Sequence, residues 1–194
     1  MIIGLTGLYC AGKNYVASIL EKRGLLVLDL DKLGHSVIES KKQLITERFG
    51  NEILKNDGTV DRYLLGTKVF GNKIMMEELQ KIVHPEVNRM TNEWIAEHQY
   101  ENCVLNAAVL HKSDVFNQLS LIILVCAPFL TRLLRAKKRD KLPWKALIRR
   151  FMSQKRFSSQ YLSKNADTCK VKNPGIEKSK LELQINSILV KFGL

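Results

Sequence analysis

Short apolar runs separated by longer amphipathic stretches dominate the pattern of the chain. Four runs are almost continuously apolar, at residues 1–5, 25–29, 103–110 and 119–126, and a more polar fifth run covers 168–172. Unbroken apolar runs are typical of parallel strands that helices cover on both faces. Because helical stretches separate these runs, their order predicts an α/β fold with a five-stranded parallel sheet and right-handed crossovers.

The longest stretch between two runs, from residue 32 to about 99, has the period of helices. Apolar side chains recur there at intervals of three and four, with breaks at Gly50, at residues 57–58 and at residues 84–85. We expect a helical insertion that binds a substrate. His84 and Pro85 are expected to form a turn where one helix ends and the next begins.

The first run leads into a glycine-containing loop and then an amphipathic helix. Gly7, Gly12 and Lys13 have the spacing G-x-x-x-x-G-K, which between a strand and a helix is the pattern of a phosphate-binding loop. Glycines let backbone N–H groups turn toward phosphate oxygens, and the helix N-terminus adds positive potential. Asn14 stands where a Ser or Thr hydroxyl usually holds Mg²⁺, and its amide oxygen can still bind a hard cation.

Asp31 follows the second run closely. Ligands of open parallel sheets gather at the carboxyl ends of the strands, where the loop from Gly7 to Lys13 also opens. An Asp after a strand often caps the next helix instead. The phosphate-binding loop favours the active-site interpretation of Asp31 over the capping one.

Charge and cysteine usage narrow the class of protein. The formal net charge of +12, from 31 Lys and Arg against 19 Asp and Glu, predicts an anionic partner such as a nucleotide, a nucleic acid or an acidic lipid. Four scattered cysteines without a C-x-x-C pair predict a reduced, cytoplasmic protein without structural zinc. No apolar run approaches the roughly 18 residues of a membrane span. Cys10 is interpreted as a small loop side chain rather than a redox switch.

A basic amphipathic segment covers residues 144–156. Taken alone it fits a helix that binds nucleic acid or a membrane surface. In a chain with a phosphate-binding loop it is better interpreted as a lid helix whose basic face turns toward a triphosphate.

An ordered series of short motifs extends along nearly the whole chain. It comprises residues 4–7 with Gly12 and Lys13, residues 27–31, 49–50, 57–58 with Arg62, 82–85, Pro128 with Arg135, Arg139 and Asp140, Arg150 with Gln154, 166–167, and Asn173 with Gly175. This series resembles the dephospho-CoA kinase family. The resemblance implies a P-loop kinase-like three-layer α/β/α fold.

The resemblance also implies an activity and assigns a role to each region of the chain. ATP would phosphorylate the ribose 3′-hydroxyl of dephospho-CoA to give coenzyme A and ADP, with Mg²⁺ as cofactor. The core would comprise residues 1–31, 100–135 and 164–194, the acceptor-binding region about 32–99, and the lid about 136–163. We expect a monomer, with an oligomer as the alternative, and neither a membrane nor a nucleic acid as partner.

The same resemblance assigns the site residues. Asp31 would orient or deprotonate the acceptor hydroxyl, assisted by Lys13, Arg135 and Thr6. Lid contacts would come from Arg150 and Gln154, and Asn14 is the candidate Mg²⁺ ligand. Acceptor binding would involve Asp31, His35, Arg62 and His84. ATP binding would involve Gly7, Leu8, Tyr9, Cys10, Ala11, Gly12, Lys13, Asn14, Tyr15, Arg139, Asn173 and Gly175.

Several positions depart from the family pattern, and all lie at the expected site. Asn14 replaces a hydroxyl residue, His35 replaces an arginine, and Asn106 and Lys112 replace acidic residues. These changes leave open the activity, the metal preference and the acceptor preference. The alternatives are a kinase for another nucleoside or nucleotide, a catalytically weak nucleotide-binding relative and a basic nucleic-acid-binding protein.

Overall fold

A computed structural model describes residues 1–152, 166–175 and 177–194. The chain forms two compact units, which are described separately. Unit 1 comprises Met1–Asp29 and His98–Leu194, and unit 2 comprises Leu30–Glu97. Among the described residues, no helix combines the length and the hydropathy that crossing a membrane requires.

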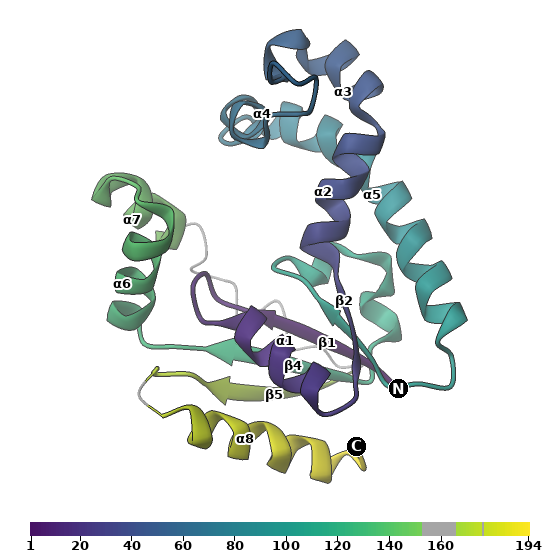
Figure 1. The fold of residues 1–194 in the computed structure, drawn as a ribbon, viewed down its shortest axis with the longest axis vertical. Helices are drawn as coiled ribbons and strands as arrows, with labels where there is room; N and C mark the ends of the chain where they lie inside the picture. Colours follow the sequence, from purple (N-terminus) through teal and green to yellow (C-terminus); the bar gives the residue numbers. More distant parts are fainter. Residues whose placement is uncertain (153–165, 176) are drawn as a thin grey trace. The chain divides into compact units, whose positions relative to one another are not determined.

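Unit 1 is built on a five-stranded sheet in which every strand pair is parallel (Figure 1). The strands lie in the order β2-β3-β1-β4-β5, so that β1 is central. This sheet confirms the predicted architecture. The strands are β1 (Ile2–Gly7), β2 (Leu26–Asp29), β3 (Cys103–Asn106), β4 (Leu121–Cys126) and β5 (Asp167–Lys172).

The third strand is shorter than its apolar run, and the prediction that it continues to Leu110 was wrong. It ends at Asn106, and a short 3-10 helix, η2 (Leu110–Lys112), follows. Leu110 is fully buried against the sheet at Gly4, where a Cβ atom would lie only 2.5 Å from its Cδ2. The apolar residues after Asn106 therefore cover the sheet instead of extending it. A second short helix, η3 (Asp114–Gln118), lies next along the chain.

Two helices, α1 (Lys13–Lys22) and α8 (Lys178–Lys191), pack on one face of the sheet (Figure 1). Ile3 and Leu5 point into this face because alternate side chains of a strand share a side. They meet Leu20 of α1 and Ile185 of α8, and all four are at most 1% exposed. Burying each such side chain contributes roughly 1.5–3 kcal/mol, which anchors both ends of the phosphate-binding loop.

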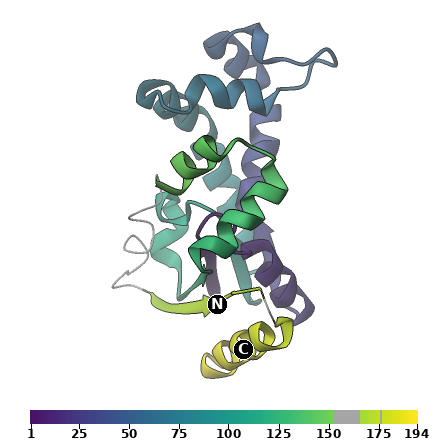
Figure 2. The same ribbon diagram turned by 90° about the vertical axis from the view of Figure 1, so that its left-hand side faces the viewer.

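Helices α6 (Phe129–Asp140) and α7 (Trp144–Met152) lie side by side in unit 1 (Figure 2). Leu147 and Phe151 of α7 are buried between them, while Trp144 and Ile148 remain about half exposed. The apolar face predicted for α7 is thus only half covered. Partly buried Tyr9 and Cys10 of the loop before α1 pack against the same cluster.

Unit 2 is helical and has a core of its own. That core includes Val37, Ile45, Phe49, Leu65 and Val83. The elements are α2 (Leu30–Ser40), α3 (Lys42–Phe49), the 3-10 helix η1 (Asn51–Ile53), α4 (Arg62–Val69) and α5 (Lys73–Glu97).

The turn predicted at His84 and Pro85 was wrong, because α5 continues through both residues. Proline removes one backbone hydrogen bond and crowds the preceding turn, at a cost of about 3 kcal/mol in a helix interior. Helix α5 has 25 residues and packs against α2, α3 and α4. The packing of its two halves offsets that local cost.

Candidate functional site

The loop between β1 and α1 has the backbone geometry of an anion cradle. Gly12 adopts a left-handed conformation with φ 96° and precedes the first residue of α1, Lys13. The first N–H groups of a helix lack intrahelical partners, and Gly12, the residue before α1, has no side chain to cap them. The N-terminus of α1, with Lys13 at its first position, is therefore suited to phosphate oxygens.

Cys10 also has a left-handed backbone, with φ 58°, which is unusual for a residue with a side chain. Burial is the main cause that raises the pKa of its thiol above the ordinary value. With its pKa raised, Cys10 is a neutral thiol at neutral pH. The reactive form of cysteine is the thiolate, so Cys10 has low reactivity. This supports the structural interpretation of Cys10.

The side chains of Arg135 and Asn173 donate hydrogen bonds to backbone carbonyls of the loop. Asn173 is 8% exposed, and its side-chain Nδ2 donates to the carbonyl of Ala11 at 2.8 Å. Arg135 Nη1 donates to the carbonyls of Cys10 at 3.4 Å and Ala11 at 3.2 Å, and its Nη2 donates to Asn173 Oδ1 at 3.3 Å. A Cβ on Gly12 would collide with the Asn173 amide. The loop conformation thus depends on these two side chains.

The same arginine explains a glycine after the last strand. Gly175 has φ 89°, and a Cβ there would collide with Arg135 Nη2. The predicted residues Arg135, Asn173 and Gly175 therefore gather at one place, against the loop carbonyls of Cys10 and Ala11. In this arrangement the Arg135 guanidinium supports the loop.

Polar side chains from the ends of two strands, β2 and β3, meet beside Asn14. The Asn106 Nδ2 donates to Asn14 Oδ1 and to Asp29 Oδ2, both at 3.4 Å. Asn106 is 2% exposed, and its Oδ1 has no hydrogen-bond partner within the described part of the chain. The hydroxyl of Thr6, fully buried in β1, likewise has none among those residues, but Thr6 alternates with Leu5 and so lies on the opposite face of the sheet from Asn106. Buried oxygens without partners are rare and indicate a place where a ligand or water belongs.

This cluster fits a hard cation that arrives with its own ligands. Mg²⁺ prefers oxygen donors and is commonly held by one or two carboxylates together with substrate phosphates and waters. Asp29 and Asn14 supply a carboxylate and an amide oxygen at the loop. Within residues 1–152, 166–175 and 177–194, no cluster of three or more His, Cys, Asp or Glu could hold a metal by itself. The donor set therefore suits a metal bound to a nucleotide rather than a closed metal site.

Two arginines of α6 and α7 lie beside the loop. Arg139 places its guanidinium carbon 5.2 Å from the centre of the Tyr9 ring, and Arg150 donates to the Tyr9 hydroxyl at 3.3 Å. Both arginines also contact Asp140, the last residue of α6. The Arg139 hydrogen bond is the main cause that holds the pKa of Asp140 below its ordinary value. A third arginine, Arg132, donates to the Tyr9 carbonyl at 3.5 Å.

In unit 2, a hollow of about 320 Å³ lies between α2 and the start of α4. Arg62 is the first residue of α4, which Asp61 caps by accepting from the backbone N–H groups of Tyr63 and Leu64. The Arg62 Nη1 lies 2.7 Å from His35 Nδ1 across the hollow's edge. The lining combines basic and acidic side chains and consists of His35, Ser36, Ile38, Glu39, Lys55, Thr59, Val60 and Arg62.

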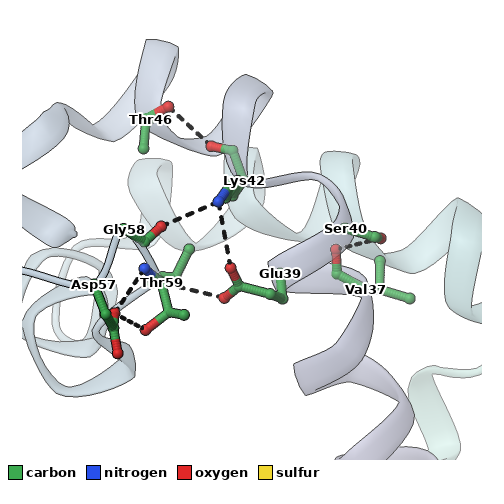
Figure 3. A network of polar contacts seen from close by, with 9 residues as sticks. Val37, Glu39, Ser40, Lys42, Thr46, Asp57, Gly58 and Thr59 are labelled. Carbon is green, nitrogen blue, oxygen red and sulfur yellow. Dashed lines mark hydrogen bonds and ion pairs between the residues drawn. The ribbon is translucent and has the colours of Figure 1, made fainter. Parts of the chain in front are cut away.

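A polar network fixes one wall of this hollow (Figure 3). Glu39 accepts the backbone N–H of Val60 at 3.0 Å and forms an ion pair with Lys42 at 3.9 Å. Lys42 also donates to the Gly58 carbonyl at 3.1 Å, while Asp57 accepts from the hydroxyl of Thr59 at 2.6 Å. These bonds hold the turn at residues 57–60 against α2, so the hollow has a fixed rim.

The other predicted acceptor residues lie elsewhere in unit 2. Asp31 lies exposed in the first turn of α2, and His84 lies half-buried in α5. Gln154 and the side chain of Lys112 fall outside the described residues. Arg132 and Asp140 contact Tyr9 of the loop, and Asp29 contacts Asn106. None of the three was predicted as a site residue. Asp29 and Asp140 both belong to the motifs shared with the family, and this membership could have identified them as site residues.

Comparisons with known proteins identify the family of this chain. Residues 1–175 match the sequence model of the family described as dephospho-CoA kinase. A dephospho-CoA kinase of Treponema pallidum is 33% identical over 203 residues, covering 100% of this chain and 96% of that protein. One from Bacillus cereus is 33% identical over 202 residues, covering 100% and 98%.

Solved structures share the fold. A protein from Thermus thermophilus gives a TM-score of 0.82 at 28% identity, covering 98% of this chain and 97% of its own. The dephospho-CoA kinase from Campylobacter jejuni gives 0.64 at 22% identity, covering 98% and 96%. A shikimate kinase from Bacteroides thetaiotaomicron gives 0.54 at 16% identity, covering 100% and 99%, and supports the P-loop kinase fold alone. Because the family model matches residues 1–175 and both relatives are 33% identical over the whole chain, the chain belongs to the dephospho-CoA kinase family.

Proposed function

We propose that this protein transfers the γ-phosphoryl group of ATP to the ribose 3′-hydroxyl of dephospho-CoA, giving coenzyme A and ADP. The observation that carries the proposal is the braced loop from Gly7 to Lys13 in a chain that matches the family over residues 1–175. Phosphoryl transfer needs positioning and charge neutralisation more than covalent chemistry. A rigid cradle of backbone N–H groups meets the first of these needs.

The donor side is proposed to lie in unit 1. Backbone N–H groups of the loop and of the start of α1 would surround the β- and γ-phosphates, apart from those of Leu8, Ala11 and Tyr15, which already donate to backbone carbonyls. Lys13 would contact the phosphate oxygens. Arg139 and Arg150, whose guanidinium groups lie beside Tyr9, would neutralise charge from the lid. Arg135 is already bonded to loop carbonyls, which supports a role in holding the loop in its phosphate-binding shape.

The acceptor side is proposed to lie in unit 2. Asp31 follows Asp29 by two residues, and Asp29 ends β2 and accepts from Asn106, which also donates to Asn14. In the reaction the 3′-oxygen attacks the γ-phosphorus, its proton passes to the Asp31 carboxylate, and the bond to the bridging oxygen of ADP breaks. Arg62 and His35 would hold anionic groups of dephospho-CoA at the rim of the hollow, with His84 a further contact.

Mg²⁺ is the proposed cofactor, and Asn14 and Asp29 would hold it directly or through water. When bound with ATP, it would neutralise charge on the β- and γ-phosphates. The unpartnered oxygens of Thr6 and Asn106 support a polar, ligand-binding role for this end of the sheet. A cytoplasmic location and a monomeric state stay predictions from the sequence.

The test is ADP release by purified protein with Mg²⁺-ATP, measured with and without dephospho-CoA. We expect strict dependence on dephospho-CoA, and Lys13→Ala should lower kcat/KM by about 10²–10³-fold because a cation on the phosphates is lost. Lys22→Ala, an exposed lysine at the end of the same helix, is the matched control and should leave activity unchanged. ADP release that ignores dephospho-CoA and survives Lys13→Ala would overturn the proposal.

Three further measurements separate the alternatives left by the sequence. A catalytically weak relative, which the Asn14–Asn106 contact favours, would bind ATP in calorimetry without turnover on any acceptor. A kinase for another substrate would release ADP only with a different nucleoside or nucleotide in an acceptor panel. A nucleic-acid-binding protein would bind DNA or RNA in a salt-sensitive way that ATP does not compete with.

A further inference from the structure

A compact polar cluster ties the phosphate-binding loop to both α6 and α7. Tyr9 comes from the loop, Arg139 and Asp140 come from the end of α6, and Arg150 comes from α7. The Tyr9 hydroxyl donates to Asp140 Oδ2 and accepts from Arg150 Nη1. All four residues belong to unit 1. One phenol therefore connects the loop with both helices.

Asp140 is the acceptor at the centre of this cluster. Its side chain is 15% exposed, and it accepts from Arg139 Nε at 2.7 Å and Nη2 at 3.3 Å and from Arg150 Nη1 at 3.5 Å. Its lowered pKa, caused chiefly by the Arg139 hydrogen bond, keeps it ionised at neutral pH. An ionised carboxylate only accepts hydrogen bonds and has room for several donors. Asp140 can thus hold Tyr9 and both arginines at once.

Tyr9 has the complementary properties. Burial is the main cause that raises its pKa, so at neutral pH it keeps the proton that it donates to Asp140. Its ring lies under the Arg139 guanidinium and meets the edge of Phe151 with centroids 5.3 Å apart. The ring fixes the position of the phenol, and the hydroxyl fixes the positions of the charged groups around it.

The two arginines are held but not enclosed. Their side chains are 61% and 51% exposed, for Arg139 and Arg150 respectively. Among the described residues Arg139 uses two N–H groups on Asp140, and a guanidinium has five donors. Arg139 therefore has donors left for a phosphate. Two cations balanced by one anion also leave a net positive charge next to the loop.

We propose that Tyr9 and Asp140 are positioning residues that hold Arg139 and Arg150 ready for the triphosphate of ATP. This rests on the proposed function only in naming ATP as the ligand of the loop. Long side chains lose rotamer freedom when they bind a ligand, and a side chain that is ordered beforehand loses less. The cluster thereby favours nucleotide binding, and neither Tyr9 nor Asp140 needs to touch the reacting atoms.

The test compares Tyr9→Phe, Asp140→Asn and the double variant. Tyr9→Phe keeps the ring contacts and removes only the hydroxyl, while Asp140→Asn keeps the shape and removes the charge. For each single variant we expect the Kd and KM for ATP to rise about three- to tenfold, with kcat and the KM for dephospho-CoA within about twofold. The double variant should lose less than the product of the single losses, because both changes break one cluster.

Tyr100→Phe, at a tyrosine that is 94% exposed, is the matched control and should change nothing. Thermal unfolding checks that each variant is folded, and either single variant suffices if the other is not. Unchanged ATP affinity in a folded variant would overturn the proposal. So would tighter ATP binding by Asp140→Asn, since Asp140 would then compete with ATP for the arginines.

Calorimetry with ATP alone keeps this proposal separate from the proposed function. Wild-type protein that binds ATP but never phosphorylates dephospho-CoA would contradict the proposed function, and the Kd values of the variants would still decide the role of Tyr9 and Asp140. Acceptor-dependent turnover with no change in the variants would contradict only the positioning role. Wild-type protein that fails to bind ATP would overturn both.

Discussion

Asn14 is the residue at which the phosphate-binding loop departs most from the usual pattern. A hydroxyl is replaced by an amide whose oxygen accepts from Asn106, and the same Asn106 amide also reaches Asp29. The amide, the carboxylate and the buried Asn106 oxygen together retain an oxygen-rich site. In the proposed site, Mg²⁺ binding would therefore be shared among three side chains instead of depending on one hydroxyl.

A Mg²⁺ titration checks this. Asn14→Ala removes one oxygen donor, so the Mg²⁺ concentration for half-maximal ATP binding should rise about tenfold, corresponding to the loss of one weak ligand. Asn14→Ser restores a hydroxyl and should stay within about threefold of wild type. Calorimetry of ATP binding over a Mg²⁺ series measures the effect without turnover. Identical metal dependence in all three proteins would exclude Asn14 as a ligand.

Asp140 gives a prediction about pH. Its folded-state pKa lies below the ordinary Asp value, so its contribution to stability is present above about pH 4 and is lost as pH falls through the lowered pKa. Asp140→Asn should be less stable than wild type at pH 7, and this difference should shrink below pH 4. Urea unfolding at a series of pH values measures it. A difference that stays constant down to pH 2.5 would show that the charge of Asp140 is not responsible.

At the scale of elements, local sequence patterns predicted those strands, loops and helices that are determined by residues close together in the sequence. The strand, loop and helix from Ile2 to Lys22 follow from one apolar run, a glycine spacing and an amphipathic period. The contact between Tyr9 and Asp140 could not be predicted in this way, because the two residues are 131 positions apart and meet only when α6 packs on the loop. Likewise, nothing local indicated that Leu110 covers Gly4.

Helix α5 shows that a proline in the sequence does not always end a helix. Proline opposes a helix locally, but the packing of α5 against α2, α3 and α4 involves much more of the helix than one residue. A sequence pattern reflects the local helix preference of each residue, but it does not include the stabilisation that comes from packing against other helices. This is why the break predicted at Pro85 is absent.

Replacing this proline should stabilise unit 2. Pro85→Ala restores a backbone N–H in the helix, and after allowance for the stiffer unfolded chain of the wild type the free energy of unfolding should rise by about 1–2 kcal/mol. Lys81→Ala, an exposed position one turn earlier, should change it by less than about 0.5 kcal/mol. Chemical denaturation followed by far-UV circular dichroism compares them. A less stable Pro85→Ala variant would mean that the proline shape itself is needed for packing.

At the scale of the whole molecule, the two units differ in how the chain builds them. Unit 2 is one continuous segment, Leu30–Glu97, with its own apolar core. Unit 1 needs segments from both sides of it. The proposed donor side belongs to unit 1 and the proposed acceptor side to unit 2, so each substrate would have its own compact unit.

The central position of β1 has a consequence for synthesis of the protein. Ile2 pairs with Cys103 and Ile3 with Leu121, so β1 is made long before either neighbour. At roughly 5–20 residues per second, about 5–20 seconds pass before the first partner strand exists. An apolar strand without partners is prone to aggregation, and unit 2 has time to fold in that interval.

Pulse-labelled hydrogen exchange during refolding checks the order. Amides of α5 should gain protection before those of β1, because contacts distant in the sequence form slowly. Protection of β1 as early as α5 would contradict this order. In the cell, the strand that carries the phosphate-binding loop would then be the part of the nascent chain that most needs a chaperone.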